Sequence, residues 1–242
     1  MLLEARDITK AFGSFKAVDA ASVTLDQGDI LGLIGPNGAG KSTFFNCLTG
    51  DLALTSGRVL FEGRDITAAT PEARAQLGLA RTFQVPQTFT GMSVLENVMI
   101  GAFLRHPHRA DAEEKAHAVL QRVGMERLAD VPARTLGTPG RKRLEIARAL
   151  ATEPKVLLLD EPVAGMNTQE KRDMRGLIQA LRQQFGVAIL LIEHDMGLVM
   201  DICEHITVLD HGVTIAAGQP AAIQEDPKVI EAYLGAPEAE GN

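Results

Sequence analysis

Three short apolar runs recur along the chain, and stretches of helical spacing separate them. The runs are residues 29–34 (DILGLI), 155–160 (KVLLLD) and 187–193 (VAILLIE). Almost every position in them is apolar, which is typical of strands buried on both faces of a parallel sheet. We therefore predict a strand at each run and an α/β fold in which right-handed crossovers connect the strands.

Two stretches between the runs have the pattern of helices. Residues 41–49 stop at Gly50, and glycine is typical just beyond a helix C-terminus. Residues 168–185 repeat apolar side chains along one helical face, and Asn167 with Glu170 makes a capping-box start. Both stretches are predicted to be helices of the α/β core.

Shorter patterns complete the prediction. Residues 2–25 and 57–62 have the pattern of strands and indicate an antiparallel lobe, and residues 206–218 indicate a hairpin around His211-Gly212. The expected parts are then residues 1–84 with 141–225 as the core and its β lobe, residues 85–140 as a helical subdomain, and residues 226–242 as a C-terminal tail. We expect the final PEAEGN to be frayed.

Composition excludes several classes of protein. The net charge of −7 argues against nucleic-acid binding through general basicity. Cys47 and Cys203 have no CxxC or Cys/His neighbourhood, so we interpret them as small buried side chains. No signal peptide is evident, and no apolar stretch reaches the roughly 18 residues that a membrane span needs. We expect a cytoplasmic protein that could dock on a membrane protein.

The first apolar run leads directly into a segment with the G-x-x-x-x-G-K-[ST] spacing. Its residues are Gly35, Pro36, Asn37, Gly38, Ala39, Gly40, Lys41, Ser42 and Thr43. Where side chains are absent, backbone N–H groups approach phosphates closely, and the positive end of the following helix adds to their field. We predict nucleotide binding, with Lys41 on the β- and γ-phosphates and the Ser42 hydroxyl on Mg²⁺. A glycine turn with an exposed lysine is the alternative.

The second apolar run ends in two acids, Asp160 and Glu161. A carboxylate at the end of a buried strand is costly unless it serves an ion. We predict that Asp160 contacts Mg²⁺ through water and that Glu161 is the general base for the attacking water. A strand that simply runs into a turn would also give LLLDE, but the phosphate loop earlier in the chain favours hydrolysis.

The order of these motifs resembles that of the nucleotide-binding subunits of ABC transporters along almost the whole chain. The motifs are the phosphate loop, RTFQ at 81–84, RLEIARALATEP at 143–154, LLLDEP at 157–162 and IEHD at 192–195. The resemblance implies a P-loop NTPase core of the RecA-like type with an antiparallel β lobe and a helical subdomain. It also implies hydrolysis of ATP with Mg²⁺.

The resemblance assigns roles to three further residues. Gln84 would sense Mg²⁺ and the attacking water, and His194 would contact the γ-phosphate. Phe12 would stack on adenine, although Phe15 is a second candidate and a core phenylalanine is a competing interpretation. Without the resemblance, Gln84 is an ordinary polar loop residue and His194 a hydrogen-bonded histidine at a strand end.

A narrower resemblance is to the ATPase subunits of branched-chain amino acid importers. RTFQ, MSVLENVMIGA, RLEIARALATEPKVLLLDEPVAGMN and the late VIEAYLG carry it. Such subunits pair with a second ABC ATPase subunit beneath two membrane permeases, on the cytoplasmic side, and an extracytoplasmic solute-binding protein feeds the permeases. Urea and lipopolysaccharide systems share much of the pattern and remain alternatives. A groove near Gln84 and Phe89 would grip the permease, or Phe89 and Met92 pack in the core.

One stretch departs from the family. The signature, usually LSGGQ or LSYGQ, corresponds to LGTPG at residues 136–140. Gly137 lacks the serine hydroxyl that would bind the γ-phosphate held by the other protomer, a loss of about 1.5–3 kcal/mol. Thr138 is one position out of register, Gly140 remains, and the following helix is expected to begin near Arg141.

The altered signature has a predicted consequence. In a heterodimer, the site with this chain's Lys41 and Glu161 stays competent and the opposite site is impaired, whereas a homodimer turns over slowly. A weakly hydrolytic ATP-dependent clamp therefore remains an alternative. An ABC ATPase of ribosomes or chromosomes is disfavoured, because the chain is acidic and has one phosphate loop and no heptad run.

Overall fold

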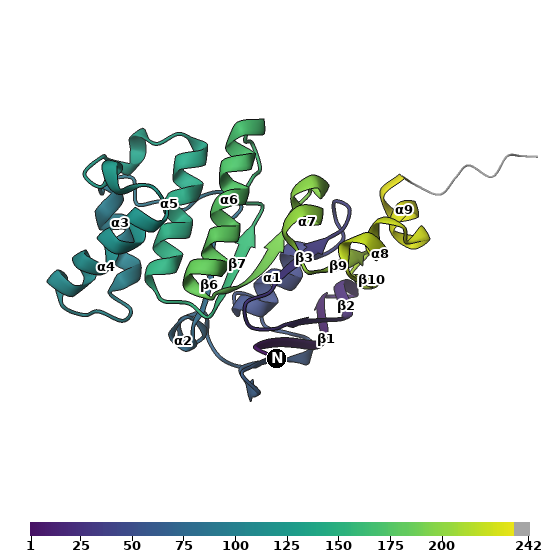
Figure 1. Ribbon diagram of the computed structural model, residues 1–242. Helices are drawn as coiled ribbons and strands as arrows, with labels where there is room; N and C mark the ends of the chain where they lie inside the picture. Colours follow the sequence, from purple (N-terminus) through teal and green to yellow (C-terminus); the bar gives the residue numbers. More distant parts are fainter. Residues whose placement is uncertain (235–242) are drawn as a thin grey trace, which may run out of the picture. The chain divides into compact units, whose positions relative to one another are not determined.

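The computed structural model describes residues 1–234, which form two compact units (Figure 1). The first unit comprises residues 1–70 and the chain from Leu190 onward, and the second comprises residues 71–189. The boundary falls inside strand β8 (Ala188–Ile192), which is buried at every position. The terminal PEAEGN, expected to be frayed, lies outside the described residues.

The first unit begins with an antiparallel sheet of order β2-β1-β4-β5. β1 (Leu3–Phe12) pairs with β2 (Phe15–Leu25) and with β4 (Ser56–Phe61), and the short β5 (Arg64–Asp65) follows at the edge. This is the antiparallel lobe that the alternating segments predict.

The same unit holds the strand that leads to the phosphate loop. β3 (Ile30–Ile34) is buried at every position and runs parallel to β9 (His205–Asp210). His211 and Gly212, both with positive φ, then turn the chain into antiparallel β10 (Val213–Gly218). The predicted buried strand and the predicted hairpin are both confirmed.

The described part of the first unit also contains four helices, one after β3 and three near the end of the chain. α1 (Lys41–Thr49) starts directly after the phosphate loop and ends at Gly50, whose φ of 84° is left-handed, as predicted. Helices α7 (Met196–Ile202), α8 (Pro220–Gln224) and α9 (Pro227–Leu234) follow later in the chain and were not predicted.

The second unit combines parallel strands with a longer set of helices. β6 (Leu79–Arg81), which follows α2 (Pro71–Leu77), runs parallel to the fully buried β7 (Val156–Asp160). α6 (Thr168–Phe185) starts at the predicted capping box, where the Asn167 side chain accepts two backbone N–H groups, and it ends at a left-handed glycine.

Three helices lie side by side in the second unit, drawn in teal in Figure 1. They are α3 (Val94–Ala102), α4 (Arg109–Arg122) and α5 (Thr138–Ala151), and short 3-10 turns at Glu126–Leu128 and Ala133–Thr135 connect α4 to α5. The helical character of this part agrees with the prediction, whereas the expected subdomain boundaries at 85 and 140 stay a prediction.

The start of α5 differs from what the sequence indicates. Gly137 is the N-cap and the helix begins at Thr138, not near Arg141. Pro139 lies in the first turn, where backbone N–H groups have no intrahelical partner, so its missing donor does not disturb the helix. The altered signature is therefore the first turn of α5.

Both cysteines are buried and unlinked, as predicted. Burial raises the pKa of the Cys203 thiol to about 12. Among the helices in residues 1–234, none combines the length and the apolar character needed to cross a bilayer.

Candidate functional site

The phosphate loop requires glycine at its two ends. Gly35 has φ 150°, and a Cβ there would lie 2.0 Å from the backbone oxygen of Leu209. Gly40 has φ 95°, and its Cβ would lie 2.3 Å from the backbone oxygen of Ala17. Real Cβ atoms do not approach backbone oxygens this closely, so β3 can pass into α1 only through this glycine-bounded bend.

Lys41 points back into the loop. Its Nζ donates hydrogen bonds to the backbone oxygens of Gly35 (2.7 Å) and Pro36 (2.9 Å), and the side chain is buried. Ser42 is exposed beside it, and Thr43 is half-buried. The first turn of α1 has no acidic residue and no side-chain cap. The helix N-terminus and the ammonium thus present positive charge to one place, which suits phosphate.

Phe12 and Phe15 face each other across the turn between β1 and β2. Their exposed fractions are 50% and 66%, so neither belongs to the core. The Nζ of Lys10 lies 5.0 Å from the centre of the Phe12 ring. Exposed aromatic faces are available for stacking on a base, and the choice of Phe12 stays a prediction.

In the second unit the structure brings Gln84 and Glu161 together. The Gln84 Nε2 donates to the Glu161 Oε2 at 2.9 Å, although the two residues are far apart in sequence. Glu161 has φ 46°, a left-handed conformation that costs a non-glycine residue about 1–2 kcal/mol. Strained backbone of this kind gathers at functional sites.

Asp160 ends β7 and is buried. Its backbone N–H donates to the Thr82 Oγ1 at 3.2 Å, and its carboxylate lies 3.9 Å from the Arg81 guanidinium. Asp160 is thus held at the end of the strand, next to Glu161 in sequence.

His194 lies in the first unit between β8 and α7. Its backbone N–H donates to the Glu193 Oε2 at 3.0 Å, and Asp195 caps α7 by accepting from the Leu198 N–H. These bonds fix the backbone on both sides of His194, while its imidazole is exposed.

The signature residues lie at an open helix end. Gly137 and Thr138 are exposed, and no side chain caps α5. Gly140 packs against Leu136, where a Cβ would come within 3.3 Å of the leucine Cβ. The N-terminal N–H groups of α5 therefore lack the hydroxyl that a serine at 137 would add.

The proposed metal donors are all oxygens: the Ser42 hydroxyl, the Asp160 carboxylate and the Gln84 amide. This set fits Mg²⁺, which uses one or two carboxylates together with phosphate oxygens and water. In residues 1–234, no three His, Cys, Asp or Glu side chains gather as a protein-only metal site. Residues 105–109 (RHPHR) contain two histidines, and one of them, His106, lies 2.9 Å from the Glu153 carboxylate.

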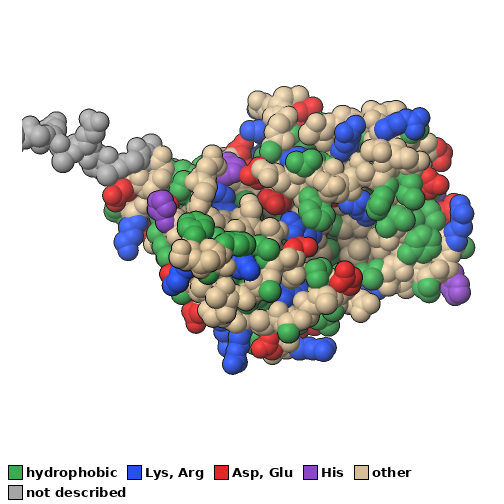
Figure 2. Space-filling model, turned by 180° about the vertical axis from the view of Figure 1, so that it is seen from behind, with side chains coloured by type: hydrophobic (Ala, Val, Ile, Leu, Met, Phe, Trp, Pro, Cys, Tyr) green, Lys and Arg blue, Asp and Glu red, His purple; other side chains and the backbone are tan. Residues whose placement is uncertain are grey.

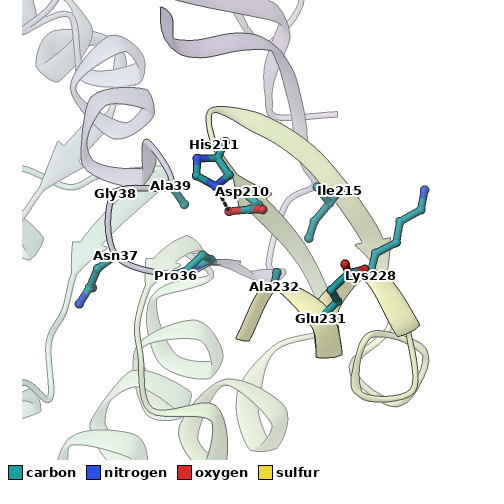
Figure 3. A pocket seen from close by; sticks show the side chains of 10 residues that line it. All are labelled: Pro36, Asn37, Gly38, Ala39, Asp210, His211, Ile215, Lys228, Glu231 and Ala232. Carbon is teal, nitrogen blue, oxygen red and sulfur yellow. Dashed lines mark ion pairs between the residues drawn. The ribbon is translucent and has the colours of Figure 1, made fainter. Parts of the chain in front are cut away.

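A cavity of about 620 Å³ adjoins the phosphate loop (Figure 3). The backbone of residues 36–39 forms one side, Lys228 and Glu231 of α9 another, and the Asp210–His211 pair, 3.8 Å apart, lies at the β9–β10 turn. Helix α9 therefore lies close to the nucleotide loop.

Tyr233 of α9 contacts the phosphate loop directly. Burial raises the pKa of its phenol, and a hydrogen bond from the Gly35 backbone opposes that rise. Sequence reasoning missed this contact, although the VIEAYLG segment that contains Tyr233 had been singled out by resemblance.

The chain is similar to known proteins over almost its whole length. The family described as ABC transporter matches residues 18–164, and the family described as Branched-chain amino acid ATP-binding cassette transporter matches residues 213–239. The chain is 39% identical to the high-affinity branched-chain amino acid transport ATP-binding protein BraF of Pseudomonas aeruginosa, over 97% of this chain and 98% of that one. It is 40% identical to LivG of Escherichia coli K12, with the same coverage.

Solved structures give the same result. A nucleotide-free ATP-binding cassette from an ABC transporter superposes with a TM-score of 0.88 and 36% identity, over 97% of this chain and 99% of that one. The ADP conformation of an ABC transporter cassette superposes with a TM-score of 0.87 and 36% identity. The predicted fold class, a P-loop NTPase of the ABC type, is confirmed.

Proposed function

Because the chain belongs to the ABC transporter family and is an ABC ATPase, we propose that it powers an importer of branched-chain or related amino acids. The observation that carries the substrate class is the second family match, at residues 213–239. That match is independent of the ATPase motifs, which ABC proteins share whatever they transport. Relatives named for branched-chain amino acid transport, similar over nearly their whole length, support the same class.

The phosphate loop supplies binding in this proposal. Backbone N–H groups of residues 37–41 and the Lys41 ammonium neutralise the phosphates of ATP, and the ring of Phe12 stacks on adenine. Lys41 exchanges its bonds to the Gly35 and Pro36 oxygens for bonds to the phosphates. The glycine-bounded bend of residues 35–40 is already formed in the structure, so we expect little ordering cost on binding.

In this proposal, Glu161 and Gln84 of the second unit and His194 of the first unit carry out hydrolysis. Glu161 accepts the proton of the attacking water, and the amide of Gln84, bonded to Glu161, helps to hold that water in line. His194 donates to the γ-phosphate. Ser42, Asp160 and Gln84 would hold Mg²⁺, which neutralises charge on the phosphate oxygens when bound.

A second copy or a paralogous ATPase subunit completes the site. We propose that the N-terminus of α5 faces the ATP of that partner. ATP binding then closes the pair and hydrolysis reopens it, which alternates the orientation of two permease subunits. The chain acts at the cytoplasmic face of the membrane, and an extracytoplasmic solute-binding protein delivers the substrate.

The permease contact is proposed at an apolar surface of the second unit. Val85, Phe89, Met92, Ile100 and Phe103 are exposed there, and three of them line or border a hollow of about 160 Å³. Figure 2, which shows the molecule from behind, has hydrophobic side chains gathered toward its right, the end that Figure 1 draws at the left with α3 and α4. Exposed apolar patches of this kind mark protein interfaces. The core interpretation of Phe89 and Met92 does not fit their exposure.

The test uses the assembled transporter in vesicles. Glu161→Gln should leave ATP bound and uncleaved, and Lys41→Ala should lower ATP affinity by at least tenfold. Binding protein loaded with leucine should stimulate phosphate release more than binding protein offered urea. If Lys41→Ala binds ATP normally, the nucleotide site is wrong; if urea stimulates and leucine does not, only the substrate class is wrong.

The altered signature favours one second candidate, an ATP-dependent clamp that hydrolyses slowly. The feature behind it is the N-cap of α5, where Gly137 offers no hydroxyl. A clamp would release phosphate equally slowly with and without the permeases, whereas a transport motor is accelerated by them.

A further inference from the structure

Helix α5 carries charged residues on a face that is buried. Lys142 is 5% exposed and Glu145 is 2% exposed, and Arg148 follows one turn later. Buried charges are costly unless hydrogen bonds satisfy them, and apolar side chains of similar size would stabilise the helix at least as well. The hydrogen-bond partners of these three side chains therefore indicate their role.

Glu145 holds both sides of the loop that contains Gln84. Its Oε2 accepts the backbone N–H of Phe83 at 3.1 Å, and its Oε1 accepts that of Gln87 at 3.0 Å. One carboxylate thus fixes the residue before Gln84 and a residue three positions after it. Burial raises the pKa of Glu145, and the two N–H bonds oppose that rise.

Arg148 reinforces the same loop. Its Nη1 donates to the backbone oxygen of Gln87 at 2.6 Å, its Nη2 lies 3.6 Å from the Glu145 Oε1, and its guanidinium lies 5.2 Å from the centre of the Phe89 ring. Residues 83–89 are therefore attached to α5 through side chains, not only through the chain.

Lys142 contacts Glu161, the residue to which Gln84 is hydrogen-bonded. Its Nζ donates to the backbone oxygen of Glu161, the residue with left-handed backbone. The Gln84–Glu161 bond of 2.9 Å joins the two contacts. The same helix thus holds Gln84 through Glu145 and Glu161 through Lys142, and its first turn is the exposed signature.

We propose that Lys142 and Glu145 are positioning residues that set Gln84 and Glu161 for hydrolysis from the signature helix. This inference rests on the proposed function, because it assigns Gln84 and Glu161 their roles. A contact at the exposed first turn of α5, such as a partner's nucleotide, would shift Lys142 and Glu145 together. That shift would change the positions of Gln84 and Glu161.

The experiment is a double-mutant cycle on steady-state hydrolysis by the assembled transporter. Glu145→Gln keeps the size of the side chain but leaves one backbone N–H without an acceptor. We expect it to lower kcat about tenfold and to change the Kd for ATP less than about twofold. In a Gln84→Ala background the same change should lower kcat less than about twofold, because Glu145 acts through Gln84.

Arg143→Met is the matched control, because Arg143 lies on α5 and its Nη1 is directed to the backbone oxygen of Val123. It should leave kcat unchanged. An equal loss of kcat from Glu145→Gln in both backgrounds would show a merely structural role and overturn the inference. If Glu145→Gln does not fold, Glu145→Asp, whose shorter side chain does not reach both backbone N–H groups, is measured in the same two backgrounds and is decided by the same criterion.

The two proposals fail differently. An inactive wild type, or a Glu161→Gln variant that hydrolyses ATP normally, contradicts the proposed function. An active wild type, an inactive Glu161→Gln and additive losses in the cycle contradict only the positioning roles.

Discussion

At the scale of single residues, backbone geometry determines which positions of the phosphate loop tolerate a side chain. Gly38 has φ 82° and open space around its missing Cβ, whereas Gly40 has φ 95° and a backbone oxygen 2.3 Å from that position. Both conformations disfavour a side chain, but only Gly40 also faces a collision with backbone that cannot move aside cheaply. The two glycines therefore separate conformational strain from steric exclusion.

We predict that Gly40→Ala is much more damaging than Gly38→Ala. Gly38→Ala should cost about 1–2 kcal/mol of unfolding free energy and keep measurable ATP binding. Gly40→Ala should cost more and abolish binding, because the loop must shift to relieve the contact with Ala17. Denaturant unfolding and nucleotide titration of both variants check this, and equal effects would contradict the described loop conformation.

The sequence is enough to identify this loop because its phosphate-binding residues follow one another within residues 35–43. Spacing alone locates Gly35, Gly40 and Lys41, since their partners lie within a few positions or on the phosphate. It could not find Glu145 or Tyr233. Their roles depend on contacts with Phe83, Gln87 and Gly35, which are distant in the chain and leave no periodic trace.

At the scale of elements, the apolar pattern of the sequence predicted the strands that are buried at every position. β3, β7 and β8 were found because every position is buried, and α6 because its capping box and final glycine are local signals. The three-residue β6 was missed because so short a strand has no period. α5 begins at Thr138 and not near Arg141, because the first turn of a helix tolerates Pro139.

An ion-pair cluster links helical elements within the second unit. The Glu153 carboxylate lies 2.6 Å from the Lys115 Nζ and 2.9 Å from the His106 Nε2. The hydrogen bond from Lys115, followed by that from His106, lowers the pKa of Glu153. The end of α5 is thereby tied to α4 and to the segment before it.

This lowered pKa predicts a pH-dependent contribution to stability. Because the folded state favours the carboxylate, the contribution is present above the unfolded glutamate pKa of about 4.3 and is lost as pH falls through the lower, folded value. Glu153→Gln should lower the Tm by about 1–3 °C at pH 7 and by less at pH 3. Glu114→Gln, an exposed acid on α4, is the control and should change the Tm at neither pH. A Glu153→Gln deficit that is equal at both pH values would contradict the assignment.

At the scale of the whole molecule, the altered signature would make the two ATP sites of a heterodimer unequal. Gly137 belongs to a helix end that completes the other subunit's site in the proposed dimer, while Lys41 and Glu161 serve this chain's own ATP. In a heterodimer the chain would receive an intact signature without offering one, whereas in a homodimer both sites would lack the serine hydroxyl.

Gly137→Ser tests this asymmetry. Restoring the hydroxyl should raise steady-state phosphate release by about tenfold or more in a homodimer, where both sites gain a hydrogen bond to charge. In a heterodimer only one site gains, so the increase should be smaller. Gly176→Ser on α6, at an open helical position, is a control that should not raise the rate. No gain in either assembly would show that Gly137 does not limit turnover.

The two buried thiols give the molecule a practical property. At neutral pH, Cys203, with a pKa of about 12, holds almost no thiolate, the form that alkylating reagents attack, and Cys47 is enclosed as well. A fluorophore maleimide should therefore label one cysteine engineered at an exposed position such as 179 on α6 without removal of the two natural cysteines. Subunit closure could then be followed by energy transfer in an otherwise native chain.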